Sequence, residues 1–126
     1  MIFLADDDPD MRNLLASSLR RAGYQVELAA SGDALVDKVL EADARGRPPD
    51  LIISDVRMGG RDGLSVLAWV SRRFANLPVI LITAFGDERT HARAVALGAA
   101  AVLNKPFELA ALRERVEAAL ATTRAR

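Results

Sequence analysis

The residues best suited to chemistry in this sequence stand where short apolar runs end. The run IFLA leads to Asp6 and Asp7, and the run LIIS leads to Asp55. Two later predicted strands end at Thr83 and Lys105, just after their apolar runs. Three carboxylates brought together raise one another's pKa unless a cation compensates, and few protein oxygens plus several waters suit Mg²⁺. A carboxylate, a metal ion, an ammonium group and a hydroxyl together describe a site for phosphoryl transfer onto an aspartate.

Five apolar runs recur at fairly even intervals, and each is continuous rather than alternating, as expected for strands buried on both faces. They cover residues 2–5, 26–29, 51–54, 79–82 and 100–103. The segments between them have helical spacing. The first and last of these segments predict apolar faces made of Met11, Leu14, Leu15, Ser18 and Leu19, and of Leu109, Leu112, Val116 and Leu120.

The residues at the ends of these segments are typical of helix caps and helix ends. Asp8 precedes Pro9 as a predicted N-cap, and Ser31 is a second one. Gly23 and Gly98 follow periodic segments as C-terminal stops. Five strands alternating with five helices predict an α/β fold, a doubly wound five-stranded parallel sheet of flavodoxin-like order 2-1-3-4-5.

The predicted strand order places the polar strand ends together. In a doubly wound sheet, ligands bind at the carboxyl ends of the strands where the winding direction switches. Strands one and three are then neighbours, so we expect Asp6, Asp7 and Asp55 to converge on one pocket. The simple alternative for any single aspartate is that it merely ends a buried strand, but five suitable residues together favour a site.

Composition excludes several classes of protein. Hydrophobic residues make up 51% and charged residues 27%, which argues against disorder. Basic and acidic residues both number 17, so no general affinity for nucleic acid or acidic membranes is indicated. The absence of cysteine excludes disulfides and thiol sites. The length fits one domain, residues 1–126. The sequence shows neither a membrane span nor a signal peptide, so we expect the cytoplasm as its location.

Four stretches follow one another along the chain: FLADDDPDMR, LIISDVRM followed by DGL, ILITAFGD, and GAAAVLNKPF. Together they resemble the successive signatures of the response-regulator receiver domain of bacterial two-component signalling, over essentially the whole chain. The resemblance implies that Asp55 is the phosphoacceptor, Thr83 the switch hydroxyl and Lys105 the partner of the phosphoryl group. It also implies a Mg²⁺ site made of Asp6, Asp7, Asp55 and the backbone carbonyl of Arg57. Asp8 is then the helix cap.

The resemblance further implies a signalling protein rather than an enzyme acting on a separate substrate. A sensor histidine kinase or phosphotransfer protein would donate the phosphoryl group, with weak self-catalysed transfer and autodephosphorylation. An output domain or partner protein would respond, with a homodimer formed through the fourth helix, fifth strand and fifth helix. We expect no direct binding to nucleic acid and none to membranes.

The sequence departs from the family pattern at three positions. Gly59 stands where a proline is frequent, and Val102 stands where an aromatic switch residue is frequent. Phe85, two residues after Thr83, is similar to the aromatic residue of nitrogen-regulation-type receivers. We therefore assign the switch to Thr83, Phe85 and Val102 together.

Three other functions remain to be weighed. A phosphatase of the haloacid dehalogenase type needs a second aspartate two residues after the nucleophile, where Arg57 stands. A flavodoxin needs a Ser/Thr-rich phosphate loop after strand one, and DDPD stands there. An interaction module that is never phosphorylated would have little use for the complete set of five site residues.

Overall fold

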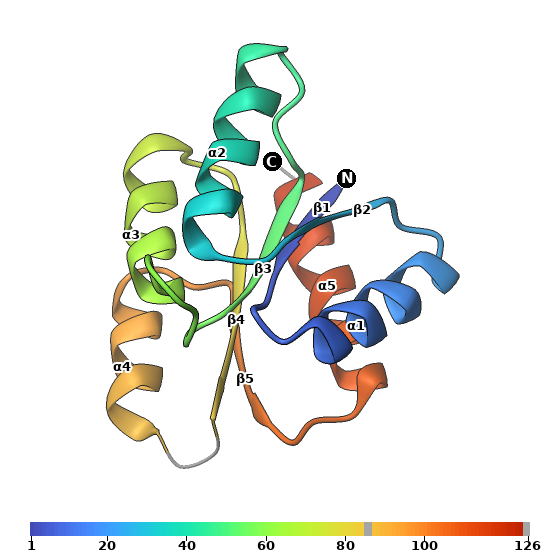
Figure 1. Cartoon of the computed structure of the whole chain (residues 1–126), viewed down its shortest axis with the longest axis vertical. Helices are drawn as coiled ribbons and strands as arrows, with labels where there is room; N and C mark the ends of the chain where they lie inside the picture. Colours follow the sequence, from blue (N-terminus) through green and yellow to red (C-terminus); the bar gives the residue numbers. More distant parts are fainter. Residues whose placement is uncertain (85–86, 125–126) are drawn as a thin grey trace.

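A computed structural model describes residues 1–84 and 87–124, with side chains as far as residue 122. Five strands alternate with five helices along the chain (Figure 1). The strands are β1 (Ile2–Ala5), β2 (Val26–Ala29), β3 (Leu51–Asp55), β4 (Val79–Ala84) and β5 (Ala101–Lys105). The helices are α1 (Pro9–Arg21), α2 (Gly32–Ala44), α3 (Gly63–Arg73), α4 (Glu88–Ala96) and α5 (Leu109–Arg124).

The five strands form one sheet of order β2-β1-β3-β4-β5, and every neighbouring pair is parallel. The predicted fold class and strand order are therefore confirmed. The apolar runs match β1 and β2, whereas β3, β4 and β5 extend beyond their apolar runs. The strand ends predicted at Asp55 and Lys105 are correct, and β4 ends one residue after the predicted Thr83. The ladder continues through polar residues, since Thr83 pairs with Asn104 and Ala84 with Lys105. Hydrophobicity alone therefore ends these strands too early.

Helices cover both faces of the sheet, with α1 and α5 on one face and α2, α3 and α4 on the other (Figure 1). Neighbouring strand residues point into opposite cores: Phe3 packs on the α2–α4 side and Leu4 on the α1–α5 side. This two-sided burial explains why the strands read as continuous apolar runs. None of the helices in residues 1–84 and 87–124 combines the length and apolar character needed to cross a membrane.

The apolar face predicted for α1 is partly wrong. Leu15, Ser18 and Leu19 are buried, but the side chain of Leu14 is 48% exposed. The apolar stripe of α1 is wider than the contact between the helix and the sheet, so Leu14 lies at the margin of the stripe. It lines a shallow hollow beside Lys105 and the start of α5. The face predicted for α5 is correct, because Leu112, Val116 and Leu120 are buried and Leu109 packs against them.

The predicted helix ends are confirmed. The Asp8 side chain accepts the backbone N–H groups of Asp10 and Met11 at 3.0 and 3.4 Å, and the Ser31 hydroxyl caps α2. Gly23 and Gly98 have φ values of 99° and 93°, a left-handed conformation that glycine adopts without strain. The Lys105–Pro106 peptide bond is cis.

The loop between β3 and α3 rests on the first turn of α2. The N–H of Gly63 donates to the carbonyl of Val56 at 2.8 Å and closes the loop at its base. Higher in the loop, the backbone carbonyl of Arg61 lies directly against Gly32, where a Cβ atom would collide with it. The guanidinium of Arg61 also lies 3.5 Å from the carboxylate of Asp33. The loop that follows Asp55 is therefore seated on a neighbouring helix.

Replacing Gly32 should disturb the contact between this loop and α2. Because the added methyl group of Gly32→Ala meets a backbone carbonyl, we expect the free energy of unfolding to fall by about 2 kcal/mol. Gly59→Ala is the matched control, since its Cβ would meet nothing within 4 Å, and it should stay within about 0.5 kcal/mol of wild type. Urea unfolding measures both. Equal stability of the two variants would contradict the seating of this loop on α2.

Candidate functional site

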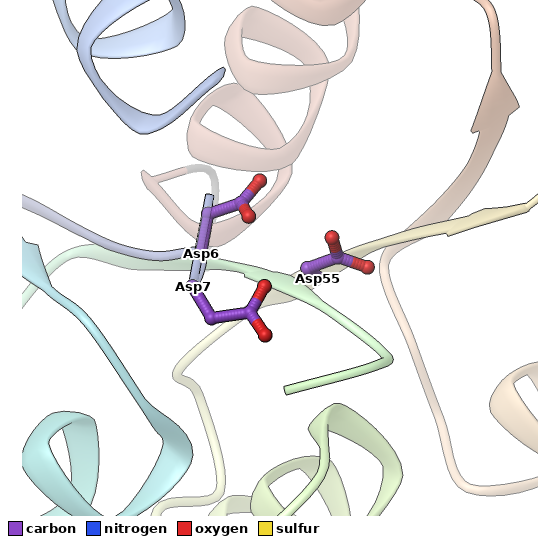
Figure 2. A group of neighbouring side chains, drawn as sticks. All are labelled: Asp6, Asp7 and Asp55. Atoms are coloured by element: carbon purple, nitrogen blue, oxygen red, sulfur yellow. The ribbon is translucent and has the colours of Figure 1, made fainter. Parts of the chain in front are cut away.

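Three carboxylates meet at the carboxyl edge of the sheet (Figure 2). Asp6 and Asp7 directly follow β1, and Asp55 is the last residue of β3. The two strands pair in parallel with Ala5 opposite Ser54, so the residues that follow emerge side by side. One ligand oxygen from each carboxylate lies within 4.8 Å of the other two. The convergence expected from the sequence is confirmed.

Asp6 is the most deeply buried of the three aspartates. It is fully buried, and its Oδ1 accepts the backbone N–H of Asp8 at 2.9 Å. In the part of the chain that the structure describes, its Oδ2 is the one buried side-chain oxygen or nitrogen without a hydrogen-bond partner. Burial, with the nearby charge of Asp55, raises the pKa of Asp6. An unpartnered carboxylate oxygen beside two other carboxylates suits a hard cation such as Mg²⁺.

Lys105 provides the positive charge that Asp55 needs. The Lys105 ammonium donates to Oδ2 of Asp55 at 2.8 Å, and the N–H of Arg57 donates to Oδ1 at 3.3 Å. Burial acts to lower the pKa of Lys105, but the hydrogen bond and the charge of Asp55 together outweigh it and raise that pKa. Lys105 therefore stays protonated, and its ammonium group holds the side chain of Asp55, a residue only 7% exposed, in place.

The predicted switch residues are only partly described. Thr83 is buried in β4, one residue beyond the residue that pairs with Asp55, and so lies at the same edge of the sheet. Val102 is partly buried in β5 and packs against the core under α2, α3 and α4. Phe85 lies outside the described residues.

Two polar contacts around the site could not be predicted from the sequence. The guanidinium of Arg12 donates to the backbone carbonyl of Asp6 at 2.8 Å. The exposed guanidinium of Arg57 lies 3.9 Å from Asp87, the N-cap of α4. Hydrogen bonds from the hydroxyl and the N–H of Thr90 lower the pKa of Asp87, with a smaller contribution from Arg57. Asp87 could have been found as a cap before a helical segment, but no sequence signal shows where Arg12 and Arg57 point.

Comparison with known families decides between the alternatives. The family model for the response regulator receiver domain matches residues 2–117. The chain belongs to this family. Receiver domains act in two-component systems, where phosphorylation of an aspartate controls an output. The phosphatase and flavodoxin alternatives are thereby set aside.

Similar proteins agree with this assignment. The transcriptional regulatory protein GltR of Pseudomonas aeruginosa is 36% identical over 94% of the chain, and ZraR of Salmonella typhimurium is 38% identical over 98%. The chain spans 48% and 27% of these two proteins. The receiver domain of NtrX from Brucella abortus has a similar structure, with 30% identity, a TM-score of 0.87 and coverage of 97% of this chain and 99% of that one.

A further structural neighbour comes from a different kind of protein. It is the receiver domain of a signal transduction histidine kinase from Syntrophus aciditrophicus, 31% identical with a TM-score of 0.83. The match covers 96% of this chain and 89% of that one. The receiver fold is therefore shared between relatives of different overall organisation.

The buried charge of Asp6 should cost the receiver domain stability. With a chelator present, we expect Asp6→Asn to raise the free energy of unfolding at neutral pH by about 1 kcal/mol, because it removes a desolvated charge beside two carboxylates. The pKa of Asp6 is raised, so the folded protein takes up a proton there at a higher pH than the unfolded chain does. The advantage of the variant should therefore shrink as the pH falls through that raised pKa.

Urea unfolding at neutral and more acidic pH measures this effect. Asp37→Asn is the control, because it removes an exposed carboxylate on α2 that lies outside the acidic cluster. A wild-type protein as stable as Asp6→Asn at neutral pH would show that the charge of Asp6 carries no cost.

Proposed function

We propose that Asp55 is the residue of this receiver domain that accepts the phosphoryl group, from a sensor histidine kinase or a phosphotransfer protein. One observation carries the proposal: the Asp55 carboxylate, at the edge of the sheet, is paired with Lys105 at 2.8 Å and faces two further carboxylates. A fixed carboxylate nucleophile beside a cation and a group of metal-ligand type is the arrangement that phosphoryl transfer needs.

The donor set fits Mg²⁺, with Asp6, Asp7, Asp55 and the backbone carbonyl of Arg57 as its ligands. Support comes from the unpartnered Oδ2 of Asp6 and from the hydrogen bond that holds the backbone of Arg57 next to Asp55. Bound Mg²⁺ would neutralise charge on the oxygens of the transferring phosphoryl group. Carboxylates and a carbonyl are the hard oxygen ligands that this ion takes.

The transfer itself exchanges one bond to phosphorus for another. A carboxylate oxygen of Asp55 attacks phosphorus, and the bond to the donor nitrogen breaks with its electron pair remaining on the imidazole. The Lys105 ammonium then pairs with a phosphoryl oxygen, and the Thr83 hydroxyl donates to another. Slow attack by water on the acyl phosphate would release inorganic phosphate and regenerate Asp55, which is the weak self-catalysed dephosphorylation expected of this site.

The phosphoryl group would act as a switch through these same contacts. It adds charge and acceptor oxygens that Lys105 and Thr83 reach in only one arrangement, which shifts the population between two states. Phe85 and Val102 would pass the change to the face formed by α4, β5 and α5, and a homodimer would form through that face. An output domain or partner protein then responds. We place residues 1–126 as one cytoplasmic receiver domain that itself contacts neither nucleic acid nor membrane.

The acceptor assignment predicts a single labelled residue. Incubation with a small acyl phosphate and Mg²⁺ should add one phosphoryl group to the wild-type protein, and Asp55→Asn should abolish it, because the amide is no nucleophile. Intact-mass spectrometry measures the product, and Asp37→Asn should label like wild type. Equal labelling of Asp55→Asn and wild type would refute the assignment. A wild-type protein that takes no label would favour an interaction module without phosphorylation.

The metal assignment separates three consecutive aspartates. Asp6→Ala and Asp7→Ala should weaken Mg²⁺ binding more than about tenfold in calorimetric titrations, because each loses a ligand oxygen. Asp8→Ala should keep the affinity, since Asp8 contacts Asp6 through its backbone N–H and uses its side chain to cap α1. It should instead lower the free energy of unfolding by about 1 kcal/mol. The largest loss of Mg²⁺ affinity in Asp8→Ala would overturn this division of roles.

A further inference from the structure

Arg12 reaches back from α1 to the turn that carries the acidic pair. Its Nη1 donates to the backbone carbonyl of Asp6 at 2.8 Å, and the side chain is partly buried. That carbonyl belongs to the planar peptide unit that joins Asp6 to Asp7. Holding the plane of this peptide restrains the backbone rotations that set where both side chains leave the backbone.

The remaining polar groups of Asp6 are also committed, with one exception. Its N–H donates to the carbonyl of Ala29 at 3.2 Å, and its Oδ1 accepts the N–H of Asp8 at 2.9 Å. With the carbonyl held by Arg12, only Oδ2 is left without a partner, and one oxygen of this carboxylate lies within 4.8 Å of ligand oxygens of Asp7 and Asp55. The hydrogen bonds around Asp6 thus leave a single oxygen available to a ligand.

We propose that Arg12 is a positioning residue for the Mg²⁺ site, an inference that rests on the proposed function of that site. Arg12 acts through the backbone of Asp6 and does not itself contact the ion. A hydrogen bond from a charged donor is shorter and stronger than one between neutral groups, so it can hold the peptide against the repulsion between the two carboxylates. Without it the carbonyl of Asp6 loses its partner and the peptide is free to tilt.

The same helix supplies a matched control. Arg20 also lies on α1, and its Nη2 donates to the backbone carbonyl of Val26 at 2.7 Å, away from the acidic cluster. Arg12→Met and Arg20→Met each keep a long side chain with good helix propensity and lose the guanidinium donor. Both variants therefore remove a hydrogen bond from an arginine of α1 to a backbone carbonyl. Arg12→Met removes it at the acidic cluster, and Arg20→Met removes it at β2.

Titration with MgCl₂ alone, followed by calorimetry, tests the proposal on the full chain. Arg12→Met should weaken Mg²⁺ binding about tenfold, as is usual when a group that orients a metal ligand is lost. Its rate of phosphorylation by a small acyl phosphate should recover to near the wild-type value at saturating Mg²⁺. Arg20→Met should bind Mg²⁺ like wild type. Urea unfolding with a chelator present should show both variants folded.

Three results would overturn the proposal in distinguishable ways. Wild-type affinity in Arg12→Met, with the wild-type protein binding Mg²⁺ normally, refutes the role of Arg12 and leaves the proposed function intact. Equal weakening in Arg12→Met and Arg20→Met shows a general loosening of α1 and also refutes it. A wild-type protein that binds no Mg²⁺ refutes the proposed metal site, and the inference falls with it.

Discussion

Three carboxylates lie close together at one edge of the sheet, and the fold has to offset the repulsion between them. Like charges repel at this range, and the burial of Asp6 removes the water that would screen them. Within the chain, the repulsion is offset by Lys105 at 2.8 Å from Asp55 and by backbone N–H groups that donate to Asp6 and Asp55. The parallel pairing of β1 with β3 holds together groups that would otherwise separate.

The sheet and its acidic edge could be predicted because both follow from local patterns. Strands buried on both faces have no polar alternation, so each appears as a short continuous apolar run. The helix ends at Asp8 and Ser31 carry their own capping chemistry within three residues. Once the strand order is set, residues that directly follow β1 and β3 have to meet, which is why Asp6, Asp7 and Asp55 could be brought together without coordinates.

The features that could not be predicted depend on contacts between distant segments or on side-chain direction. Leu14 is exposed because the sheet does not extend far enough beneath α1 to cover it. The helical spacing of apolar residues does not show how wide this contact is. The bond from Arg12 to the carbonyl of Asp6 depends on the angle at which α1 begins. The contact of Arg61 with Gly32 joins a loop to a helix far away in sequence. Of the strand ends, Lys105 was predicted correctly, and β4 continues one residue past the predicted Thr83 because Ala84 still pairs with Lys105.

The loop between β3 and α3 has a consequence for how this chain can vary. It is closed at its base by the bond between Gly63 and Val56, and it is pressed against α2 where Arg61 meets Gly32. With both attachments in place, an inserted or deleted residue would have to move either the backbone of Arg57 or the first turn of α2. Most surface loops absorb changes of length readily. In this loop, substitutions should be tolerated, whereas insertions and deletions should not.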